Sequence, residues 1–219
     1  ATAQRTMAVL HPVKLTVTNY PEGQSETFTV ENNPTDPTQG THEITFGRHL
    51  WIETEDFLET PIPKYKRLYP DGPECRLKGA YLIRCTGCVK DENGKVVEVH
   101  CTYDPESRGG NSPDGRKEKG TIHWVSATES VKAQVRLYEN IIDEEKGVYN
   151  EDGSLNLNPN SLTTLTECRL EPAFAKAQAY DRFQFVRQGF FCVDCKDTKP
   201  GELVFNRIVS LKSSYVLPK

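Results

Sequence analysis

A short stretch of the chain combines positive charge with aromatic rings. Residues 62–90 carry seven basic and two acidic side chains, so this stretch has a local charge of 7 − 2 = +5 within a chain of net charge −4. The basic residues are Lys64, Lys66, Arg67, Arg76, Lys78, Arg84 and Lys90, and tyrosines 65, 69 and 81 stand among them. Cations bind phosphates and base edges while flat rings stack on bases, so this mixture suits single-stranded nucleic acid. A solvated sheet face is the alternative interpretation.

Two Cys-x-x-Cys pairs are the other group of residues with chemical potential. Cys85 and Cys88 form one pair, and Cys192 and Cys195 form the other. Four thiolates can hold a tetrahedral zinc ion, but about 100 residues separate the pairs, against roughly 15–20 in a zinc ribbon. In a regular strand Cys85 and Cys88 would also point to opposite faces unless Gly87 opens a turn. Buried thiols that act as small hydrophobic side chains are the preferred interpretation, and no metal site is predicted.

The sequence contains no catalytic signature. Its five histidines lack the HExxH and HxH spacings, and there is no GxSxG elbow, P-loop or GxGxxG motif. Asp104 or Asp114 could pair with His123 as an acid and a base, but nothing in the sequence sets their geometry. A β-rich, non-catalytic segment with a local basic patch is typical of a recognition module.

Alternation of apolar and polar residues predicts the elements that position these groups. In residues 13–17, Val13, Leu15 and Val17 share one strand face. The same period recurs over residues 27–30, 44–46, 81–85, 96–101, 121–125, 131–137, 183–191 and 204–211. Asn93-Gly94 between two such runs predicts a hairpin with a type I′ turn. Helical signals are short: one begins at Thr54 and ends before Pro61, and another covers residues 171–178.

Length and composition favour two small β domains. The chain has 219 residues, of which 36% are hydrophobic and 26% charged, and turn signals recur between its short strands. Many short strands indicate barrels or a sandwich, and the length favours two of them. We expect the break in the polar stretch 105–119, with a first barrel region over residues 1–112 and a second over residues 113–219.

The compartment is predicted from the cysteines and from the lack of long apolar runs. Seven cysteines without a secretory segment favour a reducing cytosol, and no window approaches the roughly 20 apolar residues of a membrane helix. We therefore expect a cytoplasmic protein that does not enter membranes. The chain begins at Ala1 and its one methionine is Met7, so we expect it to be a piece of a longer protein.

Specific strings along the chain resemble the anticodon-binding region of bacterial-type glutaminyl-tRNA synthetases. They include Trp51-Ile52-Glu53 and Gly120-Thr121-Ile122-His123-Trp124-Val125. The other matching segments are residues 5–9, 11–15, 19–20, 56–57, 65–68, 76–77, 80–81, 101–104, 114–117, 183–185, 189–192 and 204–207. These matches occur in order over nearly the whole chain.

The resemblance implies an all-β fold and an RNA-reading function. It implies two six-stranded β-barrels of the ribosomal L25 type with exchanged N-terminal strands and few short helices. It also implies that the chain reads the CUG or UUG anticodon of glutamine tRNA, so that a separate catalytic domain charges that tRNA with glutamine. The parent would be a monomeric class I ligase that uses ATP and Mg. Neither a HIGH-like nor a KMSKS-like string occurs, so this fragment should need no cofactor and be inactive alone.

The resemblance also assigns individual residues to the three anticodon bases. Arg5, Gln184 and Arg187 match the pocket for the middle uridine, whose two acceptors and one donor suit guanidinium and amide groups. The remaining candidates are Arg67 for the third base, guanine, Arg76 for the first base, and Lys78 and Lys64 for neighbouring contacts. Lysine at position 78, where the family often has arginine, keeps the charge but not the bidentate fork. Lys64 and Val186 also depart from the residues common in the family.

Three alternatives remain open from the sequence. The chain could be the anticodon domain of a related glutamyl-tRNA synthetase, which would share the pair of barrels. It could be an L25-like protein that binds ribosomal RNA, although one barrel would serve that role. It could also be a zinc- or thiol-dependent β module, which metal analysis would test.

Overall fold

The computed structural model describes residues 3–112, 114–116, 118–143 and 146–211. Among these residues the regular structure is almost entirely β-strand, and the helical segments are short 3-10 turns. They are η1 Pro37–Gln39, η2 Thr54–Asp56, η3 Pro105–Ser107 and η4 Pro172–Lys176. The predicted all-β fold with few short helices is confirmed. None of the described helices has the length and apolar character that crossing a membrane requires.

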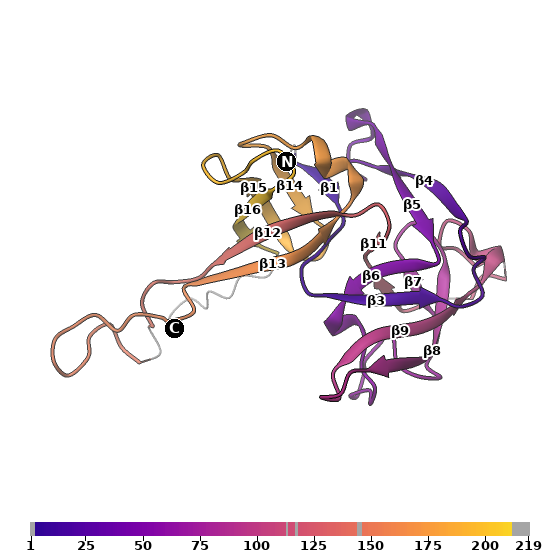
Figure 1. Ribbon diagram of the computed structural model, residues 1–219, viewed down its shortest axis with the longest axis horizontal. Coiled ribbons are helices and arrows are strands. Elements are labelled where there is room, and N and C mark those ends of the chain that lie inside the picture. The colour runs from indigo at the N-terminus through magenta and orange to yellow at the C-terminus, as the bar shows by residue number, and fades with distance from the viewer. Residues whose placement is uncertain (1–2, 113, 117, 144–145, 212–219) are drawn as a thin grey trace.

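Most of the N-terminal half forms one barrel-like sheet, which we call the N-terminal barrel. Over the described residues its strand order is β10-β7-β8-β9-β3-β6-β11. The bounds are β3 Pro12–Val17, β6 His49–Glu53, β7 Cys75–Leu77, β8 Leu82–Lys90, β9 Val96–Tyr103, β10 Gly120–Ile122 and β11 Trp124–Ser126. A hairpin of β4 (Ser25–Glu31) and β5 (Thr41–Gly47) packs on this barrel, since Phe28, Ile44 and Phe46 enter its core. In Figure 1 this hairpin extends from the N-terminal barrel toward strand β1, which belongs to the second sheet described below.

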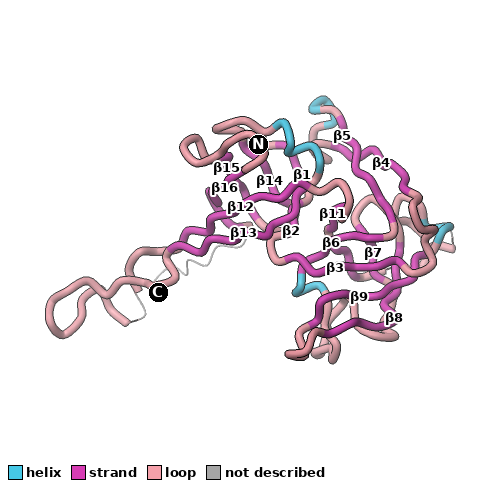
Figure 2. The backbone as a smooth tube through the Cα atoms, viewed as in Figure 1, coloured by secondary structure: helices cyan, strands magenta, loops and turns pink. Residues whose placement is uncertain are grey.

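The second sheet, which we call the C-terminal barrel, combines the two ends of the chain. Its order over the described residues is β1-β14-β15-β16-β12-β13-β2. The bounds are β1 Gln4–Thr6, β2 Ala8–Val9, β12 Val131–Tyr138, β13 Leu162–Leu170, β14 Arg182–Phe185, β15 Gly189–Val193 and β16 Leu203–Ser210. Strands β12 and β13 lead into a long arm that projects away from both barrels, as the tube in Figure 2 shows.

Each barrel is closed by one segment that is interrupted at a single residue. β1 and β2 are separated by Met7 and pair with opposite edges of the C-terminal barrel, namely β14 and β13. β10 and β11 are separated by His123 and pair with β7 and β6 of the N-terminal barrel. Counted as continuous segments, the described strands therefore give six per barrel. β1 and β2 directly precede β3 along the chain but complete the C-terminal barrel, whereas β10 and β11 directly precede β12 but complete the N-terminal barrel, so the segments are exchanged between the two units.

The first segment is packed between two hydrophobic cores. Met7 and Val9 contact the core of the N-terminal barrel, whereas Ala8 and Leu10 contact the core of the C-terminal barrel. Successive side chains of a strand point to opposite faces, so one extended segment serves both cores. The alternation fixes the position of one barrel against the other because all four side chains are buried.

Three sequence predictions need correction. The hairpin at residues 91–95 is present, but Gly94 has a positive φ and Asn93 does not, so the turn is not type I′. The predicted strand over residues 183–191 is the hairpin β14–β15, which turns at Arg187 (φ 68°). The predicted strand over residues 121–125 is split at His123. The division at residues 112 and 113 stays a prediction, although β10 and β11 pair with the N-terminal barrel.

Candidate nucleic-acid interface

Arg5 and Gln184 face each other on two neighbouring parallel strands. The register of β1 and β14 pairs Arg5 with Gln184, and Arg5 Nε donates a hydrogen bond of 2.9 Å to Gln184 Oε1. Both side chains are half-buried. This bond orients the amide, so that the guanidinium and the amide nitrogen present donors side by side.

The third member of the predicted set, Arg187, turns toward a buried carboxylate. Arg187 forms a bidentate pair with Asp56, with both N···O distances 2.7 Å. The Asp56 side chain is completely buried, and Arg67 Nη1 lies 2.9 Å from its Oδ1. Burial opposes the charge on Arg187, but the hydrogen bonds and charge of Asp56 outweigh it and raise the pKa of Arg187. The structure thus brings the predicted readers of the middle and third bases onto one carboxylate.

An exposed glutamate lies on the outer side of the same arginines. Glu55 Oε1 is 3.1 Å from Arg67 Nη1 and 3.6 Å from Arg187 Nη2, and 67% of its side chain is exposed. The hydroxyl of Tyr65 donates to the Glu55 carbonyl oxygen at 3.0 Å. Burial raises the pKa of Tyr65, which keeps it a donor. Exposed ion pairs are weak and exchangeable, so an incoming acceptor can replace the Glu55 carboxylate.

A second buried carboxylate lies where the chain crosses between the barrels. Glu53 accepts hydrogen bonds from the amides of Leu10 and His11, at 2.8 and 2.9 Å, and from Gln188 Nε2 at 2.8 Å. His123 Nε2 lies 3.3 Å from Glu53 Oε1, and its Nδ1 lies 3.3 Å from Arg187 Nη1. Burial alone would raise the pKa of Glu53, but these hydrogen bonds hold it below its ordinary value. This cluster joins the crossover to the hairpin turn that carries Arg187.

The strand β7 supplies two more predicted residues. Arg76 and Lys78 are two positions apart and half-buried, so they share the outer face of this strand and its extension. Arg76 packs against Gly110, where an added Cβ would lie 3.1 Å from Arg76 Cδ. Arg76 Nε is buried and has no hydrogen-bond partner among the residues that the structure describes.

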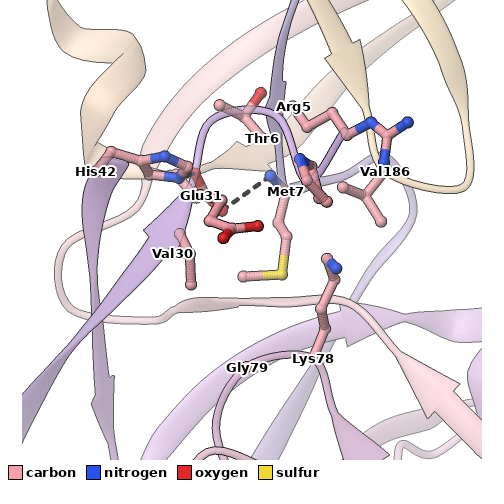
Figure 3. Close-up of a pocket in the computed structure, with 11 residues that line it drawn as sticks. Arg5, Thr6, Met7, Val30, Glu31, His42, Lys78, Gly79 and Val186 are labelled. Carbon is pink, nitrogen blue, oxygen red and sulfur yellow. Dashed lines mark hydrogen bonds and ion pairs between the residues drawn. The ribbon is translucent and has the colours of Figure 1, made fainter. Parts of the chain in front are cut away.

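A cavity of about 170 Å³ lies between the barrels and is lined by both Arg5 and Lys78. Figure 3 shows these two cations on opposite sides of Met7. The other lining residues are Thr6, Val30, Glu31, Pro34, His42, Gly79, Glu171 and Val186. One water needs only about 10–15 Å³, so the cavity has room for a planar ring. Its lining combines apolar side chains with two cations and two carboxylates, Glu31 and Glu171, and this mixture suits a flat ligand that carries both acceptors and donors.

Buried hydrogen bonds hold the back of the cavity. His42 Nε2 lies 2.9 Å from Glu171 Oε2, and the other oxygen of Glu171 accepts from the Met7 amide at 2.9 Å. His42 Nδ1 lies 2.7 Å from Asn32 Oδ1. Since His42 belongs to β5 and Glu171 precedes η4, these contacts connect the β4–β5 hairpin to the C-terminal barrel.

The predicted residues therefore form two groups. Arg5, Gln184 and Lys78 gather at or beside the cavity, whereas Arg67 and Arg187 meet at Asp56. Arg187 does not line the cavity, although its neighbour Val186 does. Lys64 lies in an exposed loop with a φ of 67° and joins neither group among the described contacts.

Sequence reasoning missed the buried acids. From the sequence, Asp56 belongs to a short helix and to a matching segment, Glu53 to a matching string, and His123 could pair with Asp104 or Asp114. The structure instead places His123 beside Glu53, whereas Asp104 and Asp114 pair with Arg116. One sequence signal could have pointed to these buried acids: Glu53 and Asp56 are three residues apart at the end of a strand, in a segment that has only a short helical signal. Most of their partners, however, are distant along the chain: His123 lies 70 positions from Glu53 and Arg187 lies 131 positions from Asp56, and only Arg67 is near Asp56 in sequence.

The cysteines do not form a cluster of metal ligands. Cys85 and Cys88 lie on β8, at a register shift that includes Gly87, whereas Cys192 and Cys195 belong to the other barrel. All seven thiols are free. No group of three or more His, Cys, Asp or Glu side chains that could hold a metal ion occurs in the part of the chain that the structure describes.

Comparison with known proteins agrees with the resemblance. Models described as "tRNA synthetases class I (E and Q), anti-codon binding domain" match residues 3–104 and 121–194. A glutamine–tRNA ligase of Clostridium kluyveri is 51% identical over 219 residues, and one of Clostridium perfringens is 50% identical over 220; each alignment covers 99% of this chain. One of Pseudomonas syringae is 48% identical over 216 residues and 97% of this chain.

The chain spans only 37–39% of the length of these relatives. The two matching models, taken together, nevertheless extend over both barrels and include Arg5, Arg67, Arg187 and Asp56. The chain therefore belongs to the family of class I (E and Q) tRNA synthetases, of which it is the anticodon-binding domain.

Proposed function

We propose that this chain is the anticodon-binding part of a glutamine–tRNA ligase and reads the CUG or UUG anticodon of glutamine tRNA. The observation that carries the proposal is the gathering of donors between the barrels: Arg5 with Gln184, and Arg67 with Arg187. Unpaired bases present acceptor edges that such donors bind. The names of the relatives favour glutamine over the glutamate alternative and over a thiol-dependent module.

The middle uridine would be bound by Arg5, Gln184 and Arg187. A uracil edge carries two carbonyl acceptors and one N–H donor. The guanidiniums serve the acceptors, and Gln184 Oε1 keeps a lone pair for the donor beside the bond from Arg5. The fixed geometry of this pair would favour uracil over cytosine, whose edge places an amino donor where uracil has an acceptor.

The two outer bases would be bound by residues of the N-terminal barrel. Guanine offers O6 and N7 as acceptors, which suit Arg67 at the third position. Arg76 would read the first base, with Lys78 on a nearby phosphate and Lys64 at the rim. Arg5, Arg76 and Lys78 have no carboxylate within ion-pair distance among the described residues, so their charge is available to RNA.

The parent protein would carry out the chemistry elsewhere. A catalytic domain outside this chain would use ATP and Mg to attach glutamine to the tRNA, and this fragment alone would be inactive. We propose a monomeric, cytoplasmic protein, in keeping with the tRNA partner. The chain's role would be to bind strongly only when all three bases fit.

Binding to anticodon stem-loops by fluorescence anisotropy tests the proposal. Replacing the middle uridine with cytidine should weaken binding by about 5- to 150-fold, the equivalent of about 1–3 kcal/mol. Arg187→Ala should reduce this ratio, whereas the matched control Arg136→Ala, whose arginine pairs with Asp194 and Asp197, should retain it. An unchanged Kd for the cytidine stem-loop would contradict the proposal.

The same assay separates glutamine from glutamate specificity. Anticodons for these amino acids share the first two bases and differ at the third, which is guanosine for glutamine and cytidine for glutamate. We expect tighter binding to the guanosine stem-loop, with a steep salt dependence because phosphate contacts release counterions. Tighter binding to the cytidine stem-loop would instead support a glutamyl-tRNA synthetase.

A further inference from the structure

We propose that Asp56 is a positioning residue that holds Arg67 and Arg187 together, so that the middle and third anticodon bases are read through one shared carboxylate. The inference rests on the proposed function and deepens it. Asp56 itself, being fully buried, would not touch RNA. Its role would be to fix the two side chains that do.

The geometry gives Asp56 control over both arginines. Arg187 uses both terminal nitrogens on the two oxygens of Asp56, and Arg67 Nη1 contacts the oxygen Oδ1 that Arg187 Nη2 also contacts. The backbone adds a further constraint, because the amide of Leu68 donates to the Asp56 carbonyl oxygen at 3.0 Å and so holds the segment that carries Arg67. Long arginine side chains lose conformational freedom on binding, so holding them beforehand reduces that cost.

The arginines come from different barrels. Arg187 lies in the β14–β15 turn of the C-terminal barrel, while Asp56 lies in η2 directly after β6 of the N-terminal barrel. A shift of one barrel against the other would therefore move Arg187 relative to Arg67. Asp56 ties the two sites, and His123, at 3.3 Å from Arg187 Nη1, supports the same arrangement.

The charges at this site also favour an RNA acceptor over the free state. Two guanidiniums share one buried carboxylate, and the second negative charge comes from the largely exposed Glu55. A base edge can displace Glu55 without exposing Asp56. Arg187 Nε has no hydrogen-bond partner among the described residues, which leaves a further donor in the rigid fork.

A purely structural role for Asp56 makes a different prediction. If the carboxylate only tied the barrels together, its loss would lower stability and leave the preference between bases unchanged. If Asp56 positions the arginines, its loss weakens the preference for the middle base and the preference for the third base together. The deciding measurement is therefore the ratio of Kd values for changed and unchanged stem-loops at each position, rather than the affinity itself.

The experiment compares wild-type chain, Asp56→Asn, Asp56→Glu and the control Asp194→Asn. Asp194 is a largely buried carboxylate that lies 3.6 Å from Arg136, away from the proposed base contacts. Each chain is titrated with stem-loops altered at the middle base, at the third base, or at neither, and its melting temperature is recorded. We expect Asp56→Asn to lower both ratios by about tenfold, Asp56→Glu to lower both by less, and Asp194→Asn to lower neither.

The outcomes separate the two levels of inference. If the wild-type chain prefers neither base, the proposed function fails and the role of Asp56 fails with it. If the wild-type chain discriminates and a folded Asp56→Asn chain keeps either ratio, the positioning role alone is overturned. If Asp56→Asn does not fold, Asp56→Glu is used in its place because it retains the negative charge. Both Kd ratios of Asp56→Glu must then fall below those of wild type, and a ratio equal to that of wild type overturns the positioning role.

Discussion

Replacement of Glu53 by glutamine should strongly destabilise the chain, because four donors converge on this carboxylate. One oxygen accepts from Leu10 N, Gln188 Nε2 and His123 Nε2, and the other accepts from His11 N. A glutamine amide can keep the first oxygen, but its NH₂ group then faces the N–H of His11. The position is 1% exposed, so water cannot compensate freely.

The magnitude follows from the contacts. The lost bond to His11 costs about 1–3 kcal/mol, and each of the other three loses about 1 kcal/mol of charge assistance. Together these effects reduce the free energy of unfolding by about 4–6 kcal/mol, a range that overlaps the roughly 3–5 kcal/mol cost of breaking a buried ion pair. That is a large share of the roughly 5–15 kcal/mol that stabilises a domain.

Urea unfolding followed by tryptophan fluorescence measures this effect, since Trp51 and Trp124 both lie in the N-terminal barrel. The control Glu167→Gln removes a carboxylate that is 60% exposed and pairs with Lys132, and its urea midpoint should stay close to that of wild type. A Glu53→Gln chain as stable as this control would refute the reasoning.

The pH dependence provides a second check. Because folding holds the pKa of Glu53 below its ordinary value of 4.5, the contribution of the charged form is complete above pH 4.5. It is lost as the pH falls through the lower folded-state pKa. The difference in stability between wild type and Glu53→Gln should therefore shrink under acid conditions, and a difference that grew instead would contradict the assignment.

Three further predictions concern other residues. Glu55→Gln removes an exposed competitor for the paired arginines, so the stem-loop Kd should fall by about two- to fivefold in anisotropy, not rise. Gly120→Ala would place a methyl group 1.9 Å from the Lys66 carbonyl oxygen, so the free energy of unfolding should drop by about 3 kcal/mol and the urea midpoint should fall with it. An unchanged midpoint would exclude this clash. Burial raises the pKa of Cys75 to about 12, so at about pH 8 Cys75 should resist a thiol reagent that labels the exposed Cys195. Peptide mass spectrometry would measure the labelling of each cysteine, and equal labelling would disprove this prediction.

Most strands could be predicted because burial on one face leaves a period of two. Alternation does not predict the strand Leu162–Leu170, because only Cys168 and Leu170 at its C-terminal end are buried in a core. The first part of the strand is exposed beside the arm. No alternation is required where both faces meet water. The hairpin at Arg187 was read as one strand because Phe185 and Phe191 are both buried, and periodicity does not register the positive φ between them.

The cations of the site could be found from local composition and from the resemblance, but their partners could not. Arg187 and Asp56 are 131 positions apart, and their meeting depends on how the barrels pack. Asp56 follows a buried strand and precedes Phe57, a context that suits an ordinary surface acid. Arg187, in the β14–β15 turn of the other barrel, contacts this buried carboxylate, and no local pattern encodes that contact.

The acidic net charge of the chain is compatible with an RNA partner because charge acts locally. At about 0.15 M salt, exposed charges more than about 8 Å apart are largely screened, so the acids of residues 139–152 have little effect on the cations between the barrels. Buried Asp56 is different: it lowers the repulsion between two arginines that must stand close together, and this allows both to be held ready. Arg5 and Lys78, which line the cavity beside Met7, form no ion pair among the residues that the structure describes, so their charge can attract a phosphate or base. In the proposed function, Arg67 and Arg187 would therefore be base readers whose charge is partly neutralised, whereas Arg5 and Lys78 would add stronger attraction, with Arg5 also choosing the middle base through its bond to Gln184.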